Sequence, residues 1–102
     1  MTQQEILEGN KLIAEFMGNE KVNKNTSDDV YFHHYKYHSS WDWLVPACRK
    51  WGILSETENI GCKDYEDLSD ALDAEISTYL IEPTFNQLVL CIKWYNQQNK
   101  NQ

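Results

Sequence analysis

The segment TFNQLVLCIKWYNQ, residues 84–97, has the broadest apolar stripe in the chain. Thr84 and Gln87 have the spacing of a capping box, in which two side chains satisfy backbone amides at the start of a helix. The apolar residues that follow recur at helical intervals: Phe85, Leu88, Val89, Ile92 and Tyr95, with Leu90, Cys91 and Trp94 beside them. The pattern predicts a helix over residues 84–97 that is the most buried element of the fold.

The segment before it predicts a second amphipathic helix, over residues 65–80. Asp64 is a residue type that caps helix starts, and Pro83 would end the helix because the residue before a proline avoids helical geometry. The apolar stripe of this helix contains Tyr65, Leu68, Leu72, Ile76 and Tyr79. Its acidic residues fall on other sides: Glu66, Asp67, Asp70 and Asp73.

Two further helices are expected nearer the N-terminus. Thr2 and Glu5 have capping-box spacing and are followed by apolar residues at helical intervals up to Gly18, which predicts a helix over residues 3–17. Residues 42–51 predict another. Asp42 is the preferred cap there, because Pro46 then falls at the end of the first turn; deeper in a helix a proline costs about 3 kcal/mol.

The segment VYFHHYKY, residues 30–37, predicts a strand because it is rich in aromatic residues. Residues 53–62 could supply a short second strand that pairs with it. Together these segments predict an α+β fold of four helices with a small two- or three-stranded sheet. Residues 1–102 are expected to form one compact domain, with a mobile loop near residues 19–29 and a frayed tail over residues 98–102.

The negative charge of the chain is concentrated in one segment. The net charge is −7, and residues 56–82 hold nine acids and a single base, Lys63. Such a segment repels nucleic acid and attracts basic protein surfaces. Direct nucleic-acid contact is therefore disfavoured, although Arg49 and Lys50 form a small basic cluster and the tyrosine-rich strand could stack bases.

The three cysteines predict free thiols rather than a disulfide framework or a zinc module. Cys48, Cys62 and Cys91 are odd in number, far apart and without a CxxC pair. His33 and His38 could combine with Cys48 around a metal, but the spacing fits no standard zinc site. Neither a metal nor a cofactor is expected.

Catalytic motifs are equally weak. The segment His38 to Asp42 contains the residue types of a hydrolase triad, but helix capping explains its serines and its aspartate. Asp67 and Asp70 lie one helical turn apart without a calcium-binding loop, and the scattered glycines form no phosphate-binding loop. The protein is expected not to be an enzyme.

Nothing in the sequence points to a membrane. No apolar run approaches the roughly 20 residues that span a bilayer. The first eight residues also lack the basic-then-apolar order of a signal peptide. An intracellular protein without a membrane partner is expected.

Three segments resemble a known group of proteins: NKLIAEFMG at residues 10–18, YHSSWDWLVPA at residues 37–47 and CIKWYN at residues 91–96. In this order they are similar to small uncharacterised proteins of phages, prophages and genomes of the Bacteroidota group, some described as a phage α/β/α-sandwich domain. The resemblance implies a phage origin and a compact α/β core, and it brings no established activity. Residues 52–82, with the acidic segment, do not match the pattern.

Small phage proteins with acidic surfaces include many inhibitors of host defence. By this analogy the chain is expected to be a non-enzymatic anti-CRISPR or other anti-defence protein in the cytoplasm of the host bacterial cell. Its partner would be a basic nucleic-acid-handling surface, such as that of a CRISPR nuclease or its RNA complex. The residues expected to carry the docking are Asp64, Glu66, Asp67, Asp70, Asp73 and Glu75, with Tyr65 or Trp41 as an aromatic anchor.

Two alternatives stay open at this point. One is a nucleotide or small-ligand sponge built around the aromatic strand, Arg49 and Lys50. The other is a structural protein of the virion.

Overall fold

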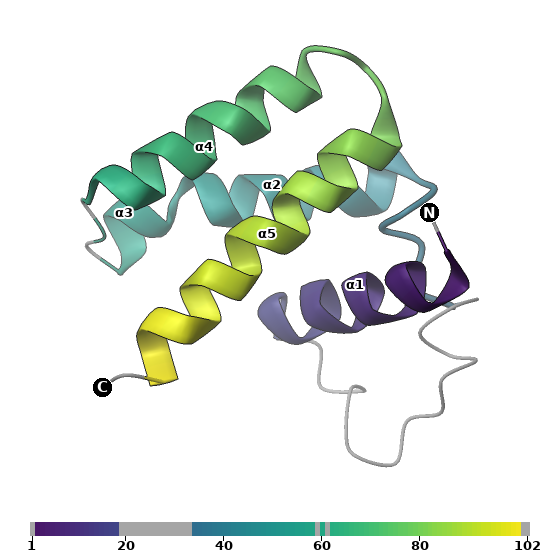
Figure 1. Cartoon of the computed structure of the whole chain (residues 1–102), viewed down its shortest axis with the longest axis horizontal. Helices are drawn as coiled ribbons and strands as arrows, with labels where there is room; N and C mark the ends of the chain where they lie inside the picture. Colours follow the sequence, from purple (N-terminus) through teal and green to yellow (C-terminus); the bar gives the residue numbers. More distant parts are fainter. Residues whose placement is uncertain (1, 19–33, 59, 61, 101–102) are drawn as a thin grey trace.

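The computed structural model describes residues 2–18, 34–58, 60 and 62–100. Within this part of the chain five helices follow one another: α1 (Gln3–Phe16), α2 (Trp41–Gly52), α3 (Leu54–Thr57), α4 (Lys63–Ile76) and α5 (Ile81–Lys100). Helix α5 contacts α1, α2 and α4, and Figure 1 shows it crossing the molecule between α1 and α4. This helix is predicted to be the most buried element, and it holds more buried residues than any other described helix: Thr84, Phe85, Leu88, Cys91 and Ile92.

The predicted α+β fold is wrong, as is the α/β core that the resemblance implies. The described residues contain no strand, and residues 54–57 of the proposed second strand are helical. Residues 30–33 of the proposed first strand lie outside the described residues, as does the predicted loop at residues 19–29.

The aromatic alternation that suggested a strand has another cause. Tyr35 and Tyr37 are both buried, and their rings are stacked with centroids 6.3 Å apart. The ring of Trp43, in the first turns of α2, meets both tyrosines edge to face, at 5.9 and 5.4 Å. Alternate residues therefore face the core as in a strand, but they pack on a helix and need no hydrogen-bonded partner strand.

The N-cap half of the capping box predicted at the N-terminus is confirmed. Thr2 Oγ1 accepts a hydrogen bond from the backbone amide of Glu5 at 3.1 Å and donates one to Glu5 Oε1 at 3.2 Å. Gly18 follows α1 with a φ of 69°, a left-handed conformation that suits glycine after a helix end. Helix α1 thus begins and ends close to the predicted bounds.

Helix α2 begins one residue earlier than predicted, with Ser40 rather than Asp42 as its N-cap. The carbonyl of Ser40 accepts from the amides of Trp43 at 3.1 Å and Leu44 at 3.0 Å. Pro46 consequently lies in the second turn, where its missing amide leaves the carbonyl of Asp42 without its helical donor. Asp42 is exposed, so water can satisfy this carbonyl.

The turn between α4 and α5 also differs from the prediction. Cys62, not Asp64, is the N-cap of α4, and the helix ends at Ile76, well before Pro83. Ser77 Oγ donates to the Asp73 carbonyl at 2.9 Å and Thr78 Oγ1 to the Glu75 carbonyl at 2.6 Å. Hydroxyls that bond to nearby backbone carbonyls compete with helical hydrogen bonds, which favours an end at this point.

Pro83 starts the next helix instead of ending this one. It lies in the first turn of α5, where a missing amide costs little because first-turn amides have no helical partner. Thr84 is not a cap: it is buried inside α5, and its hydroxyl donates to the Leu80 carbonyl at 2.9 Å. Helix α5 continues to Lys100, so the tail predicted to fray from residue 98 is helical up to that residue.

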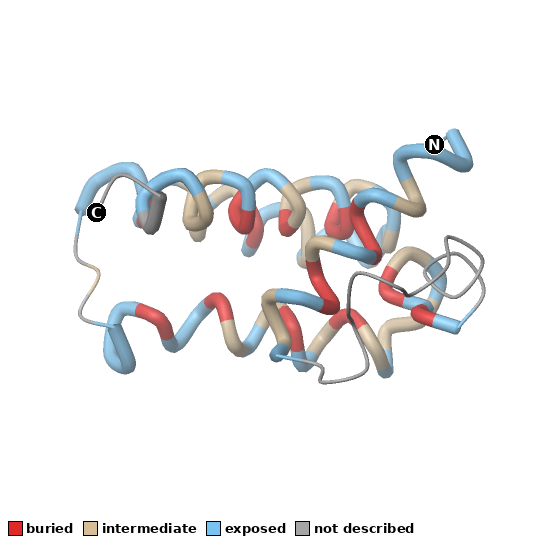
Figure 2. Tube along the Cα trace, turned by 90° about the horizontal axis from the view of Figure 1, so that it is seen from below, coloured by how far each residue is buried: buried red, intermediate tan, exposed pale blue. Residues whose placement is uncertain are grey.

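Figure 2 shows the buried residues as patches spaced along the helices, with exposed residues between them. This spacing follows from 3.6 residues per turn and one inward face per helix. In the described residues no helix is both long and apolar enough to cross a membrane.

Candidate interaction surface

Helix α4 presents a row of carboxylates on the side that faces away from the core. Each residue of an α-helix is rotated by about 100° from the one before it, which places positions 66, 67, 70 and 73 on one arc opposite positions 65 and 72. Tyr65 and Leu72 are buried, and the four carboxylates are exposed: Glu66, Asp67, Asp70 and Asp73. These four residues are called the acidic face below, and the exposure predicted for them is confirmed.

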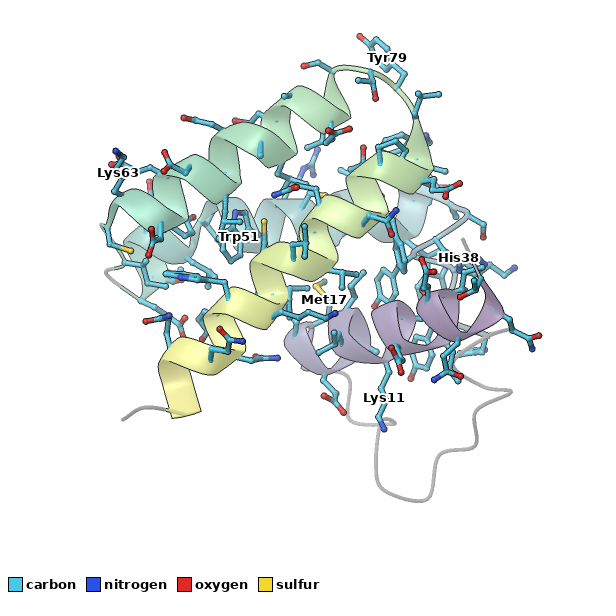
Figure 3. The ribbon with its side chains drawn as sticks, viewed as in Figure 1. Lys11, Met17, His38, Trp51, Lys63 and Tyr79 are labelled. Carbon is cyan, nitrogen blue, oxygen red and sulfur yellow. The ribbon has the colours of Figure 1, made fainter. Side chains whose placement is uncertain are left out.

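Helix α4, which carries the acidic face, packs mainly on α5, and polar and aromatic contacts with Trp51 of α2 also hold it. Trp51 is only 1% exposed, and its indole Nε1 donates to Ser69 Oγ at 3.0 Å. The hydroxyl of Tyr65 donates to the carbonyl of Trp51 at 2.6 Å, and the two rings lie 4.8 Å apart. Figure 3 shows Trp51 in the interior beside α4. The carboxylates therefore stand on a helix whose inner side is fixed.

The other predicted docking residues are placed differently. Asp64 is exposed at the start of α4, and Glu75 is half-buried; both lie on the flank of the helix and not on its acidic face. Tyr65, proposed as an anchor, is 5% exposed and directed into the core. Trp41, the other proposed anchor, is half-buried at the start of α2, where it packs against the core.

Tyr79 and Leu80 form an exposed apolar tip in the turn after α4, which the sequence pattern did not predict. Tyr79 was expected in the buried stripe of the helix, but it is 85% exposed, and the adjacent Leu80 is 59% exposed. Tyr79 adopts a φ of 59°, which is unfavourable for a residue other than glycine. Figure 3 shows its side chain at the turn after α4, directed away from the protein. The hydroxyls of Ser77 and Thr78 were the available sign that the helix ends before Tyr79.

A mixed polar and apolar cleft of about 670 Å³ opens on another side of the molecule, and residues of α1, α2, α3 and α5 line it. Lys50 Nζ donates to the carbonyl of Phe16 and lies 5.0 Å from the centroid of the Phe16 ring. Across the cleft, the Tyr95 hydroxyl donates to Glu58 Oε2. Lys50 and Glu58, two of the charged residues that line the cleft, are thus already engaged with neighbouring groups of the protein.

The side chain of His38 is fixed by a polar contact with α1. The amide nitrogen of the buried Asn10 lies 2.9 Å from His38 Nδ1 and donates to the Tyr35 carbonyl at the same distance. Because an amide nitrogen can only donate, this contact favours a neutral ring in which Nδ1 accepts. Burial lowers the pKa of His38 below its ordinary value of 6.5. His33, the other histidine considered for a metal site, lies outside the described residues, which hold no group of three metal-ligating side chains.

Acidification is expected to destabilise the protein through His38. Because the folded state lowers this pKa, the unfolded chain binds more protons as the pH falls below about 6.5, and stability decreases through the folded pKa. The difference in urea midpoint between about pH 7.5 and pH 5.5 measures this loss. His38→Gln keeps an acceptor without titrating and should show a smaller difference. An unchanged pH dependence in His38→Gln would assign the effect to other groups.

All three cysteines of the chain are free thiols, as predicted. Burial raises the pKa of Cys48 to about 11, with a smaller contribution from the charge of Asp73. Burial also raises the pKa of Cys91 to about 12. Both thiols therefore stay protonated and unreactive in the folded protein, whereas Cys62 is exposed at the start of α4.

The exposed surface of α4 and of the turn after it presents two kinds of side chain to a partner. The acidic face offers carboxylates for basic groups, and Tyr79 and Leu80 offer an aromatic and an aliphatic side chain in the turn after α4. Comparison with models of protein families, with curated proteins and with solved structures finds no match to this chain.

Proposed function

We propose that this protein is a non-catalytic inhibitor that docks its acidic face on a basic, nucleic-acid-handling surface of another protein. The observation that carries the proposal is the separation of the two sides of α4. Glu66, Asp67, Asp70 and Asp73 share one exposed arc, while the opposite side is fixed by Trp51 and Tyr65. Such a surface needs little reordering on binding, which reduces the entropic cost of association.

The electrostatics support a competitor of nucleic acid. Residues 56–82 carry nine acids and one base in a chain of net charge −7. A row of carboxylates can occupy the lysine and arginine side chains that otherwise neutralise phosphates, and attraction between the two surfaces accelerates their encounter. The inhibitor would thereby exclude or misplace the nucleic acid without any chemical step.

The identity of the partner rests on the resemblance to small phage proteins of the Bacteroidota group. Phage proteins with acidic surfaces include inhibitors of host defence, so the partner we propose is a defence effector in the bacterial cytoplasm, with a CRISPR nuclease or its RNA complex as the leading case. Tyr79 and Leu80, in the turn that follows α4, are exposed apolar side chains that would add contact area to this docking.

A small-ligand sponge has one observation in its favour, the cleft of about 670 Å³. Its polar lining argues against a nucleotide, because Glu15 and Glu58 would face the phosphates. Lys50, the base that could offset them, already donates to the Phe16 carbonyl. The aromatic strand on which this alternative was built is also absent from the described residues.

The test is a tagged pull-down from a lysate of Bacteroidota cells at low and high salt. Each recovered protein is then purified, and displacement of its nucleic acid is measured by gel shift. The wild type is expected to recover a nucleic-acid-handling protein at low salt only, because salt screens exposed charges. The variant Glu66→Ser/Asp67→Ser/Asp70→Ser/Asp73→Ser should need at least about tenfold more protein to displace the nucleic acid.

The matched control removes four exposed acids from other helices: Glu8→Ser, Glu15→Ser, Asp42→Ser and Glu56→Ser. It has the same net charge as the test variant, so it separates a local surface from bulk charge. Both variants should melt within a few degrees of the wild type because all eight side chains are exposed. Full inhibition by the test variant, or an equal loss in the control, would contradict the mechanism.

A further inference from the structure

A shallow notch of about 340 Å³ lies between the start of α4 and the C-terminal half of α5. Asp64, Asp67, Leu68 and Trp94 line it. The indole of Trp94 packs edge to face against the buried Trp51, with ring centroids 6.2 Å apart. This contact fixes the aromatic wall of the notch to the core, so the wall is formed before anything binds.

The carboxylates of the notch stand beside its apolar walls. Asp64 and Asp67 are three residues apart on α4, a spacing that makes their side chains neighbours on one flank of the helix. Both are exposed, whereas Leu68 and Trp94 are half-buried. A group that fills the notch must therefore have a cationic end that pairs with the two carboxylates. It must also have a flat or aliphatic part that packs on Leu68 and the Trp94 indole.

We propose that this notch binds an arginine side chain of a basic protein segment. The planar guanidinium can donate to both carboxylates and can also stack on an indole, while the aliphatic stem covers Leu68. Lysine carries a compact, strongly hydrated charge and uses such a site less well. The inference rests on the proposed function, since it names the side chain that the partner would present to this flank of α4.

Lys63 is the base nearest in sequence to the two carboxylates and is the natural competitor for them. Lys63 is exposed in the first turn of α4. Figure 3 shows its side chain directed away from α5, the helix that carries Trp94. The notch therefore stays accessible to a cation from another molecule.

The experiment is a calorimetric titration of the full chain with a hexa-arginine peptide, with hexalysine and spermidine as competing probes at the same salt. Wild-type protein is expected to bind hexa-arginine about tenfold more tightly than hexalysine. Asp64→Asn/Asp67→Asn should weaken hexa-arginine binding about tenfold. The control Asp70→Asn/Asp73→Asn removes the same charge from the acidic face and should weaken it only about two- to threefold.

The variant Trp94→Leu tests the aromatic wall, and it should reduce the preference for arginine over lysine. Trp94 also contacts Trp51, so the melting temperature of the Trp94→Leu variant is measured first. If this variant does not fold, the aspartate variants alone decide the result. Equal losses in the two aspartate variants, or equal affinity for all three probes in the wild type, would overturn the notch as an arginine site.

These titrations need no partner, so their outcome is independent of the pull-down. Failure of the notch with successful displacement of nucleic acid would leave the acidic face as the whole docking surface. A functional notch in a protein that displaces no nucleic acid would overturn the proposed function and leave the arginine site standing.

Discussion

Replacing Trp51 by alanine is expected to lower the free energy of unfolding by about 3–5 kcal/mol, the usual cost of truncating a buried aromatic side chain. Trp51 is 1% exposed, and its ring contacts those of Tyr65 on α4 and Trp94 on α5. Its loss would also leave Ser69 Oγ without the indole donor at 3.0 Å. Domains of this size have about 5–15 kcal/mol of stability, so a large part of the total depends on one residue.

Urea denaturation followed by circular dichroism measures the change in the free energy of unfolding. Two further variants separate the contribution of packing from that of the hydrogen bond. Trp51→Phe keeps most of the apolar volume and removes the donor, and it should cost about 1–2 kcal/mol. Ser69→Ala removes only the acceptor and should cost no more than about 1–3 kcal/mol through the unpaired indole. A loss below about 1 kcal/mol in Trp51→Ala would mean that α4 does not pack on α2 as described.

The same contact explains why part of the site could be predicted from the sequence. Positions 65 and 72 are apolar while 66, 67, 70 and 73 are acidic, and a period of 3.6 residues alone separates the two groups. The partner of the apolar side could not be predicted in this way. That Tyr65 donates to the Trp51 carbonyl, and is therefore no surface anchor, depends on residues distant in the sequence.

The predicted sheet, which is absent from the described residues, shows what a local sequence pattern cannot predict. Tyr35 and Tyr37 alternate as in a half-buried strand, and alternation reports only which side chains face inward. Whether the inner face meets a strand or a helix is decided by tertiary packing, here by Trp43. The end of α4 was misplaced for a related reason. Apolar spacing continues to Tyr79, whereas the backbone tightens before it, where the amides of Thr78 and Tyr79 donate to the carbonyls of Glu75 and Ile76.

Gly9 of α1 should not accept a side chain without strain, because it lies directly against Phe85 of α5. A Cβ atom at this position would lie 2.3 Å from Phe85 Cζ and 2.8 Å from Phe85 Cε1, on a ring that is itself buried. Overpacking of this kind costs about 1–3 kcal/mol or more, against the roughly 1 kcal/mol that alanine gains over glycine inside a helix. We expect Gly9→Ala to lower the free energy of unfolding by about 1–2 kcal/mol, or the melting temperature by about 4–16 °C.

Gly52, the last residue of α2, provides the matched control because a Cβ there would meet nothing within 4 Å. Gly52→Ala should leave the stability unchanged or raise it by up to about 1 kcal/mol. Phe85→Leu removes the ring atoms that clash, so in the double variant the loss should be at least about 1 kcal/mol smaller than the sum of the single losses. Additive losses would show that the cost at Gly9 does not come from contact with Phe85, and that α1 and α5 are not packed as closely as the structure places them.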